Sequence, residues 1–180
     1  VSLYLPYDSD LNDDSSNGHT ASAGGGAAIS STQSKFGGYS LYLDGSDDRI
    51  SYGDDNSFEF GSGDFTMEAF IYPTDLSHHS LTKVVLGKFS GQGANMGFVF
   101  GVSNTNYLQF FYSTTGNGVV GYFTSSTTQI TTNQWYHPGV SAELILNGEK
   151  VLSFGELHPS LKSKFKIKQP TIICEGSIDK

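Results

Sequence analysis

A two-residue apolar alternation, repeated across residues 36–73, constrains the fold of this chain more than any other feature. Leu41 and Leu43 alternate with polar neighbours, and a longer run then sets apolar side chains at Phe65, Met67, Ala69 and Ile71. Successive side chains of a strand point to opposite faces, so both runs are predicted to be strands. Glycine and aspartate, which favour turns, separate them at 44–47 and 61–64.

The rest of the chain has the same character. Its 180 residues include 22 glycines, 13 phenylalanines and 10 tyrosines, and no sustained 3.6-residue pattern marks a helix. Further strands are predicted at 3–5, 96–102, 107–112, 119–123 and 129–137, and Asn147-Gly148 predicts a hairpin over 144–152. We expect one domain over 1–180, a two-sheet antiparallel sandwich that buries Leu41, Leu43, Phe65, Met67, Ala69, Ile71, Phe98 and Phe100.

Several phrases carry a resemblance to a known family. They are SLYLDG at 40–45, GDFTMEAFIYP at 63–73, DSSNGHT at 14–20, QSKFGG at 33–38 and NQWYH at 133–137. They resemble the laminin-G-type (LamG-like) modules of the concanavalin A-like lectin and glucanase superfamily, found in phage virion and secreted bacterial proteins. The resemblance implies an all-β, two-sheet antiparallel jelly-roll sandwich, with Trp135 in a core strand and an extracellular or virion-surface location. Residues 138–175 match the family poorly.

The supply of aromatic side chains predicts a binding function, beside the alternative that these side chains pack in the core. Sugar rings stack on aromatic faces, so the expected function is a lectin-like adhesion module whose partner is carbohydrate or another surface glycan, bound through Tyr107, Tyr112 and Tyr122. A structural decoration or fibre protein, with protein partners in a virion or extracellular assembly, is the alternative. A glycoside hydrolase is disfavoured, because the paired carboxylates of retaining enzymes are missing and Glu68 stands alone on its strand. We therefore expect no enzyme activity.

Charge and hydrophobicity limit the partners further. The formal net charge of -8 argues against nucleic acid, since phosphate binding needs clustered lysine and arginine. No apolar run approaches the ~20 residues of a membrane helix, so no membrane insertion is expected. The chain starts with Val1, which suggests a processed protein or one module of a longer protein.

The acidic loop near the start is a candidate metal site. An EF-hand is excluded, because Asp13 stands where that loop needs glycine and His19 where it needs glutamate. A looser calcium site remains open, beside the alternative of a solvated polar loop. Its oxygen ligands are predicted to come from this loop and from a later turn, at Asp8, Asp14, Asn17 and Asp44.

Overall fold

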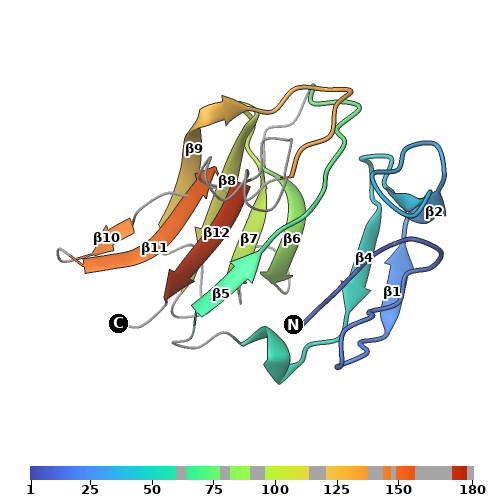
Figure 1. Ribbon diagram of the computed structural model, residues 1–180, viewed down its shortest axis with the longest axis horizontal. Coiled ribbons are helices and arrows are strands. Elements are labelled where there is room, and N and C mark those ends of the chain that lie inside the picture. Colours follow the sequence, from blue (N-terminus) through green and yellow to red (C-terminus); the bar gives the residue numbers. More distant parts are fainter. Residues whose placement is uncertain are drawn as a thin grey trace. The chain divides into compact units, whose positions relative to one another are not determined.

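The computed structural model describes residues 1–59, 64–77, 82–89, 96–113, 121–137, 144–146, 149–156 and 172–177. In this part the regular secondary structure is all strand apart from one short 3-10 helix at Asn56–Phe58, so the all-β prediction is confirmed (Figure 1). None of the described helical residues belongs to a helix long and apolar enough to cross a membrane. The chain divides into two compact units, Val1–Glu59 and Phe60–Lys180. The single-domain organisation stays a prediction.

The first unit holds two small antiparallel sheets. Strand β1 (Ala21–Gly24) pairs with β4 (Arg49–Tyr52), and β2 (Ala28–Ser30) pairs with β3 (Ser40–Tyr42). The predicted strand at 3–5 is irregular instead, because the acidic loop takes its hydrogen bonds: the Tyr4 carbonyl accepts the amide of Asp14.

The second unit holds two four-stranded antiparallel sheets (Figure 1). One is a meander in the order β6-β7-β8-β9, formed by Lys83–Phe89, Met96–Val102, Tyr107–Tyr112 and Gly121–Gln129. The other has the order β10-β11-β12-β5, formed by Leu144–Leu146, Glu149–Glu156, Ile172–Ser177 and Asp64–Met67. The predicted 144–152 hairpin is confirmed as the β10-β11 pair. Its Asn147-Gly148 turn lies outside the described residues.

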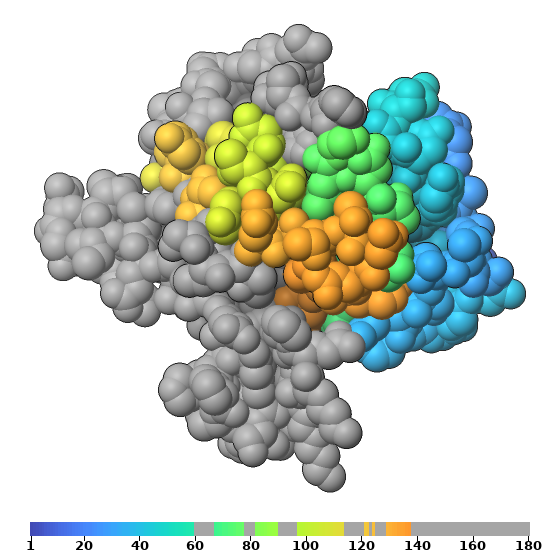
Figure 2. All heavy atoms as spheres, turned by 90° about the horizontal axis from the view of Figure 1, so that it is seen from above, coloured from blue at the N-terminus to red at the C-terminus, as the bar shows by residue number. Residues whose placement is uncertain are grey.

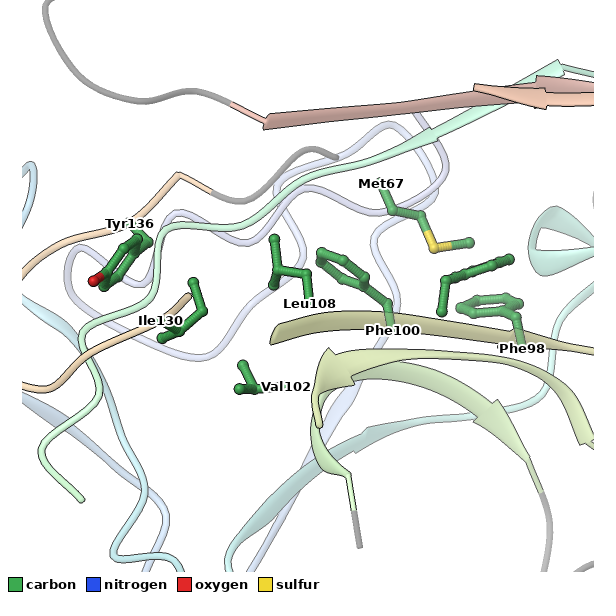
Figure 3. Close-up of a cluster of buried hydrophobic side chains, with 8 residues drawn as sticks. Met67, Phe98, Phe100, Val102, Leu108, Ile130 and Tyr136 are labelled. Atoms are coloured by element: carbon green, nitrogen blue, oxygen red, sulfur yellow. The ribbon is translucent and has the colours of Figure 1, made fainter. Parts of the chain in front are cut away.

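The apolar core lies between strands of both these sheets. In Figure 3, Met67 descends from β5 toward Phe98 and Phe100, which stand on β7. The predictions for these three side chains are confirmed, and Ile71 packs against them partly buried. The buried cluster comprises Met67, Phe98, Phe100, Val102, Leu108, Phe110, Ile130 and Tyr136.

The prediction for Leu43 is wrong, since this side chain is 43% exposed. Leu41 and Ala69 are only half-buried, and the side chain of Phe65 lies outside the described part. Leu41 belongs to β3, whose two-stranded sheet carries too few apolar side chains to cover either face. Within residues 1–59, all of which are described, the one buried side chain is a carboxylate, that of Asp13.

Candidate functional site

Two segments that are far apart in the sequence run antiparallel beside the core. The amide of Ile71 donates to the Tyr136 carbonyl at 3.0 Å, and the amide of Tyr136 donates to the Ile71 carbonyl at 2.9 Å. Figure 2 shows the segment 129–137, in orange, beside 67–77, in green. Because side chains alternate along extended backbone, the neighbours of these two residues face away from the core.

These outward neighbours form an aromatic strip, defined here as Glu68, Phe70, Tyr72, Trp135 and His137. The ring of Phe70 stacks on that of His137 with centroids 4.0 Å apart and planes 10° apart. Tyr72 contacts Trp135 in a tilted arrangement at 5.4 Å. Phe70 is 38% exposed, so the strip offers a flat aromatic face to solvent.

A hydrogen-bonded pair of side chains lies at one end of the strip. Glu68 Oε2 is 3.2 Å from Nε2 of His137, whose side chain is mostly buried while that of Glu68 is exposed. The hydrogen bond from His137 lowers the pKa of Glu68 and outweighs the opposing effect of desolvation. Sequence reasoning missed this pair and treated Glu68 as isolated. No local pattern links the two residues, because they come from distant parts of the sequence that the Ile71–Tyr136 bridge joins.

Tyr136 positions the segment that carries half of the strip. Its hydroxyl accepts the amide of Thr131 at 2.9 Å and lies 2.8 Å from the Thr131 hydroxyl, and Gln134 donates to it as well. The loop before the strip is thus folded around a buried phenol. Tyr136, and not Trp135 as expected, is the buried aromatic here, while Trp135 is half-buried on the outward side.

The three tyrosines predicted to bind a ligand do not share one face. Tyr112 packs against the core cluster. Tyr122 pairs with Phe111 on the opposite face of the sheet, is 63% exposed, and holds its ring 5.9 Å from that of Phe111. Tyr107 lies an even number of residues from Phe111 along β8 and so shares its face. A ligand contact at Tyr107, Tyr112 or Tyr122 stays a prediction.

All four predicted calcium ligands lie in the first unit. Asp8 and Asp14 are exposed, the side-chain Nδ2 of Asn17 donates to the Ser2 carbonyl at 3.0 Å, and Asp44 accepts the backbone amide of Ser46 at 2.8 Å. Across the described residues, no group of three or more His, Cys, Asp or Glu side chains has a metal-binding arrangement. Calcium, which also takes carbonyl and amide oxygens, stays a prediction.

Asp13, which sequence reasoning did not select, organises the acidic loop. Its Oδ1 accepts the amides of Tyr4 and Ser15, each at 2.9 Å. Its Oδ2 accepts the His19 amide at 2.9 Å and the Ser15 hydroxyl at 2.8 Å. Burial raises the pKa of this carboxyl, but these hydrogen bonds outweigh burial and lower it to about 2. Asp13 therefore holds three segments together, and its oxygens are already occupied.

Comparison with known proteins changes the interpretation of the chain. A family model, the phenylalanyl tRNA synthetase beta chain CLM domain, matches residues 116–178, about a third of the chain. No curated protein and no solved structure matches this chain. The match contradicts the resemblance to concanavalin A-like, LamG modules and, with it, the lectin, carbohydrate-binding, adhesion and virion or fibre functions. Short phrases of alternation and turn are shared by unrelated β folds, which explains the error. The extracellular or virion-surface location stays a prediction.

The expected partners change as well. A match to a tRNA synthetase domain conflicts with a carbohydrate partner and with the exclusion of nucleic acid. That exclusion relied on the net charge of the whole chain, which is unevenly distributed. Residues 1–59 hold ten acidic and two basic residues, whereas residues 60–180 hold eight of each. The acidity thus belongs to the first unit, and residues 116–178 are similar to the phenylalanyl tRNA synthetase beta chain CLM domain.

Proposed function

We propose that this chain is a non-catalytic tRNA-binding module whose contact surface belongs to the second unit. The similarity of residues 116–178 to a domain of a tRNA synthetase beta chain carries this proposal. Two properties of the same unit support it, namely its charge pattern and its exposed aromatic strip.

The charge pattern favours a polyanion at the second unit. Within the matched segment, lysines stand at every second position, at Lys162, Lys164, Lys166 and Lys168. Lysines that neutralise phosphates release condensed counterions, and this release drives binding to nucleic acids. Residues 60–180 carry no net formal charge, so no net negative charge of this unit opposes the attraction.

The aromatic strip supplies a surface for unpaired bases. RNA-binding proteins stack splayed-out bases on aromatic side chains, at ~1–3 kcal/mol per base. The stacked pair of Phe70 and His137 is partly exposed, with 38% of the Phe70 side chain open to solvent, so the strip can contact an unpaired base. Trp135 and His137 belong to the matched segment itself.

We also propose that the module is not an enzyme. The Ser57 hydroxyl lies 3.0 Å from Nε2 of His19, a distance compatible with nucleophilic catalysis. The neighbouring amides of Phe58 and Glu59, however, already donate within the 3-10 turn, at 3.1 and 3.0 Å. They are therefore not available to stabilise an oxyanion, which is a main requirement of acyl transfer.

Fluorescence anisotropy with labelled, unfractionated tRNA tests the function. Affinity should fall steeply between 50 and 200 mM salt, by roughly 0.7–0.9 in log–log slope for each phosphate contact. The double variant Lys166→Glu/Lys168→Glu should bind more weakly and with a shallower slope. Lys35→Glu/Arg49→Glu is the matched control, because it reverses two charges in the first unit.

The strip is tested in the same assay. Phe70→Ala should weaken binding by about 5-fold to 150-fold, the loss of one stacked base. Absence of measurable tRNA binding at 50 mM salt would show the proposal to be wrong, as would equal losses in the two double variants. An intact affinity in Phe70→Ala would remove the strip from the contact surface.

For the fold, we propose that the two four-stranded sheets form the layers of an antiparallel sandwich. Met67 of β5 shares its cluster with Phe98 and Phe100 of β7, which supports face-to-face packing of the two sheets.

A further inference from the structure

The first unit has an unusual balance of buried and exposed side chains. Its 59 residues bury no apolar side chain, although small domains depend on such burial for their stability. Large apolar side chains of this unit are instead exposed, at Val1, Tyr4, Phe36, Tyr39, Tyr42 and Leu43. Contiguous exposed apolar surface is typical of interaction sites.

Four of these residues are close in the sequence, within residues 36–43. This segment, which carries Phe36, Tyr39, Tyr42 and Leu43, is named here the apolar hairpin edge. Phe36 is 66% exposed and Tyr42 is 51% exposed. The segment includes β3, which pairs with β2 alone among the residues that the structure describes. A two-stranded sheet is marginally stable by itself, and the outer backbone groups of such a strand are available to a further strand.

Charge indicates what kind of strand fits there. The first unit carries ten acidic residues against two basic ones, and Asp44, Asp47 and Asp48 follow the apolar hairpin edge directly. Asp48 accepts the amides of Gly26 and Asp44, which hold its carboxylate in place. This surface repels the phosphates of RNA and repels the same unit of a second copy, whereas it attracts lysine and arginine.

We propose that the apolar hairpin edge docks an extended, lysine- or arginine-bearing segment of another protein, which adds to β3 as a third strand. Backbone hydrogen bonds along β3 supply affinity, as in other cases of strand addition. Alternate side chains of the added strand face opposite sides, so apolar ones cover Tyr42 while basic ones reach the aspartates. The proposal concerns the first unit and does not depend on tRNA binding by the second.

Designed peptides provide the test, by anisotropy at 150 mM salt. The probe is a labelled nonapeptide in which lysine alternates with phenylalanine. Three comparison peptides carry glutamate for lysine, serine for phenylalanine, or N-methyl groups at every second residue, which block strand pairing. The lysine–phenylalanine probe should bind. Each comparison peptide should bind about tenfold more weakly or worse, since each lacks the charge attraction, the apolar contact or the backbone hydrogen bonds. Equal binding of the N-methylated peptide would refute strand addition.

Variants of the protein separate specific docking from general attraction to an acidic surface. Tyr42→Ser leaves the charge unchanged and should weaken peptide binding by about tenfold or more. Phe36→Ser, outside both strands, gives the same test if Tyr42→Ser unfolds the sheet. Tyr122→Ser, equally exposed but in the second unit, is the control and should bind like the wild type. Wild-type affinity in both hairpin-edge variants would mean that charge alone attracts the peptide and would overturn the proposal.

Discussion

Replacing Asp13 by asparagine removes one charge and almost no volume, so it tests whether this carboxylate holds the first unit together. Asparagine keeps the oxygen that accepts the amides of Tyr4 and Ser15. Its NH2 group takes the place of Oδ2 and meets the amide of His19, which is also a donor. The variant therefore loses one hydrogen bond and weakens the others, because a neutral acceptor replaces a charged one.

The expected loss is large for a unit of this size. Hydrogen bonds to charged groups contribute about 1.5–3 kcal/mol each. One lost bond and the weakened remainder predict a destabilisation of ~2–4 kcal/mol at pH 7, or a lowering of the melting temperature by roughly 10–30 °C.

The loss should also depend on pH, with a defined sign. The pKa of Asp13 lies at about 2 in the folded protein, below its ordinary value of 3.8. A lowered pKa stabilises the fold fully above the unfolded value and progressively less as the pH falls through the folded one. This difference corresponds to about 2 kcal/mol, which screening near the surface reduces to ~1–2 kcal/mol. The gap between wild type and Asp13→Asn should therefore be constant above pH 5 and shrink between about pH 4 and 2.

Amide hydrogen exchange measured by NMR provides the assay, because it reports on the first unit separately. Protection of the Tyr4, Ser15 and His19 amides should fall sharply in Asp13→Asn. Asp14→Asn is the matched control, an adjacent and exposed residue with the same change of charge. Equal protection in the two variants, or a difference that does not shrink in acid, would refute the assigned role of Asp13.

Three further predictions concern packing and metal binding. Gly101→Ala should destabilise the second unit in thermal unfolding, because the new Cβ would overlap the carbonyl oxygen of Lys83 on β6. Gly53→Ala, with open space around it, should not, and equal melting temperatures would contradict this. Phe100→Ala should cost ~3–5 kcal/mol in urea unfolding, as expected for a buried phenylalanine, and a cost below 1 kcal/mol would contradict the core described here. Millimolar calcium should raise the melting temperature relative to EDTA in the wild type and not in Asp14→Ala, and coincident wild-type curves would exclude the calcium site.

Local alternation predicted the strands better than it predicted burial. The run through Met67 identified β5 and its buried face correctly, and the run through Phe98 and Phe100 identified β7. The same argument failed at Leu43, which is exposed. Alternation determines which residues share a face, whereas burial depends on a second layer that covers it, and that layer comes from distant sequence.

The candidate site was harder to predict for the same reason. The contact between Glu68 and His137 depends on backbone hydrogen bonds between two distant, irregular segments, which no local pattern indicates. Asp13 had a local signal, since an aspartate often accepts the amide two residues further on, here that of Ser15. Asp10 makes the same turn with Asn12 and is nevertheless exposed, so this signal could not separate the structural aspartate from a solvated one.

The polar interior of the first unit has a calorimetric consequence. The heat capacity of unfolding arises chiefly from newly hydrated apolar surface, and the apolar side chains of residues 1–59 are at most half-buried, so unfolding this unit exposes little such surface. Their stability curve should therefore be flat with temperature and their response to urea shallow, whereas the second unit, with Phe100 and Leu108 in its core, should show both effects strongly. A single melting temperature would then describe neither unit.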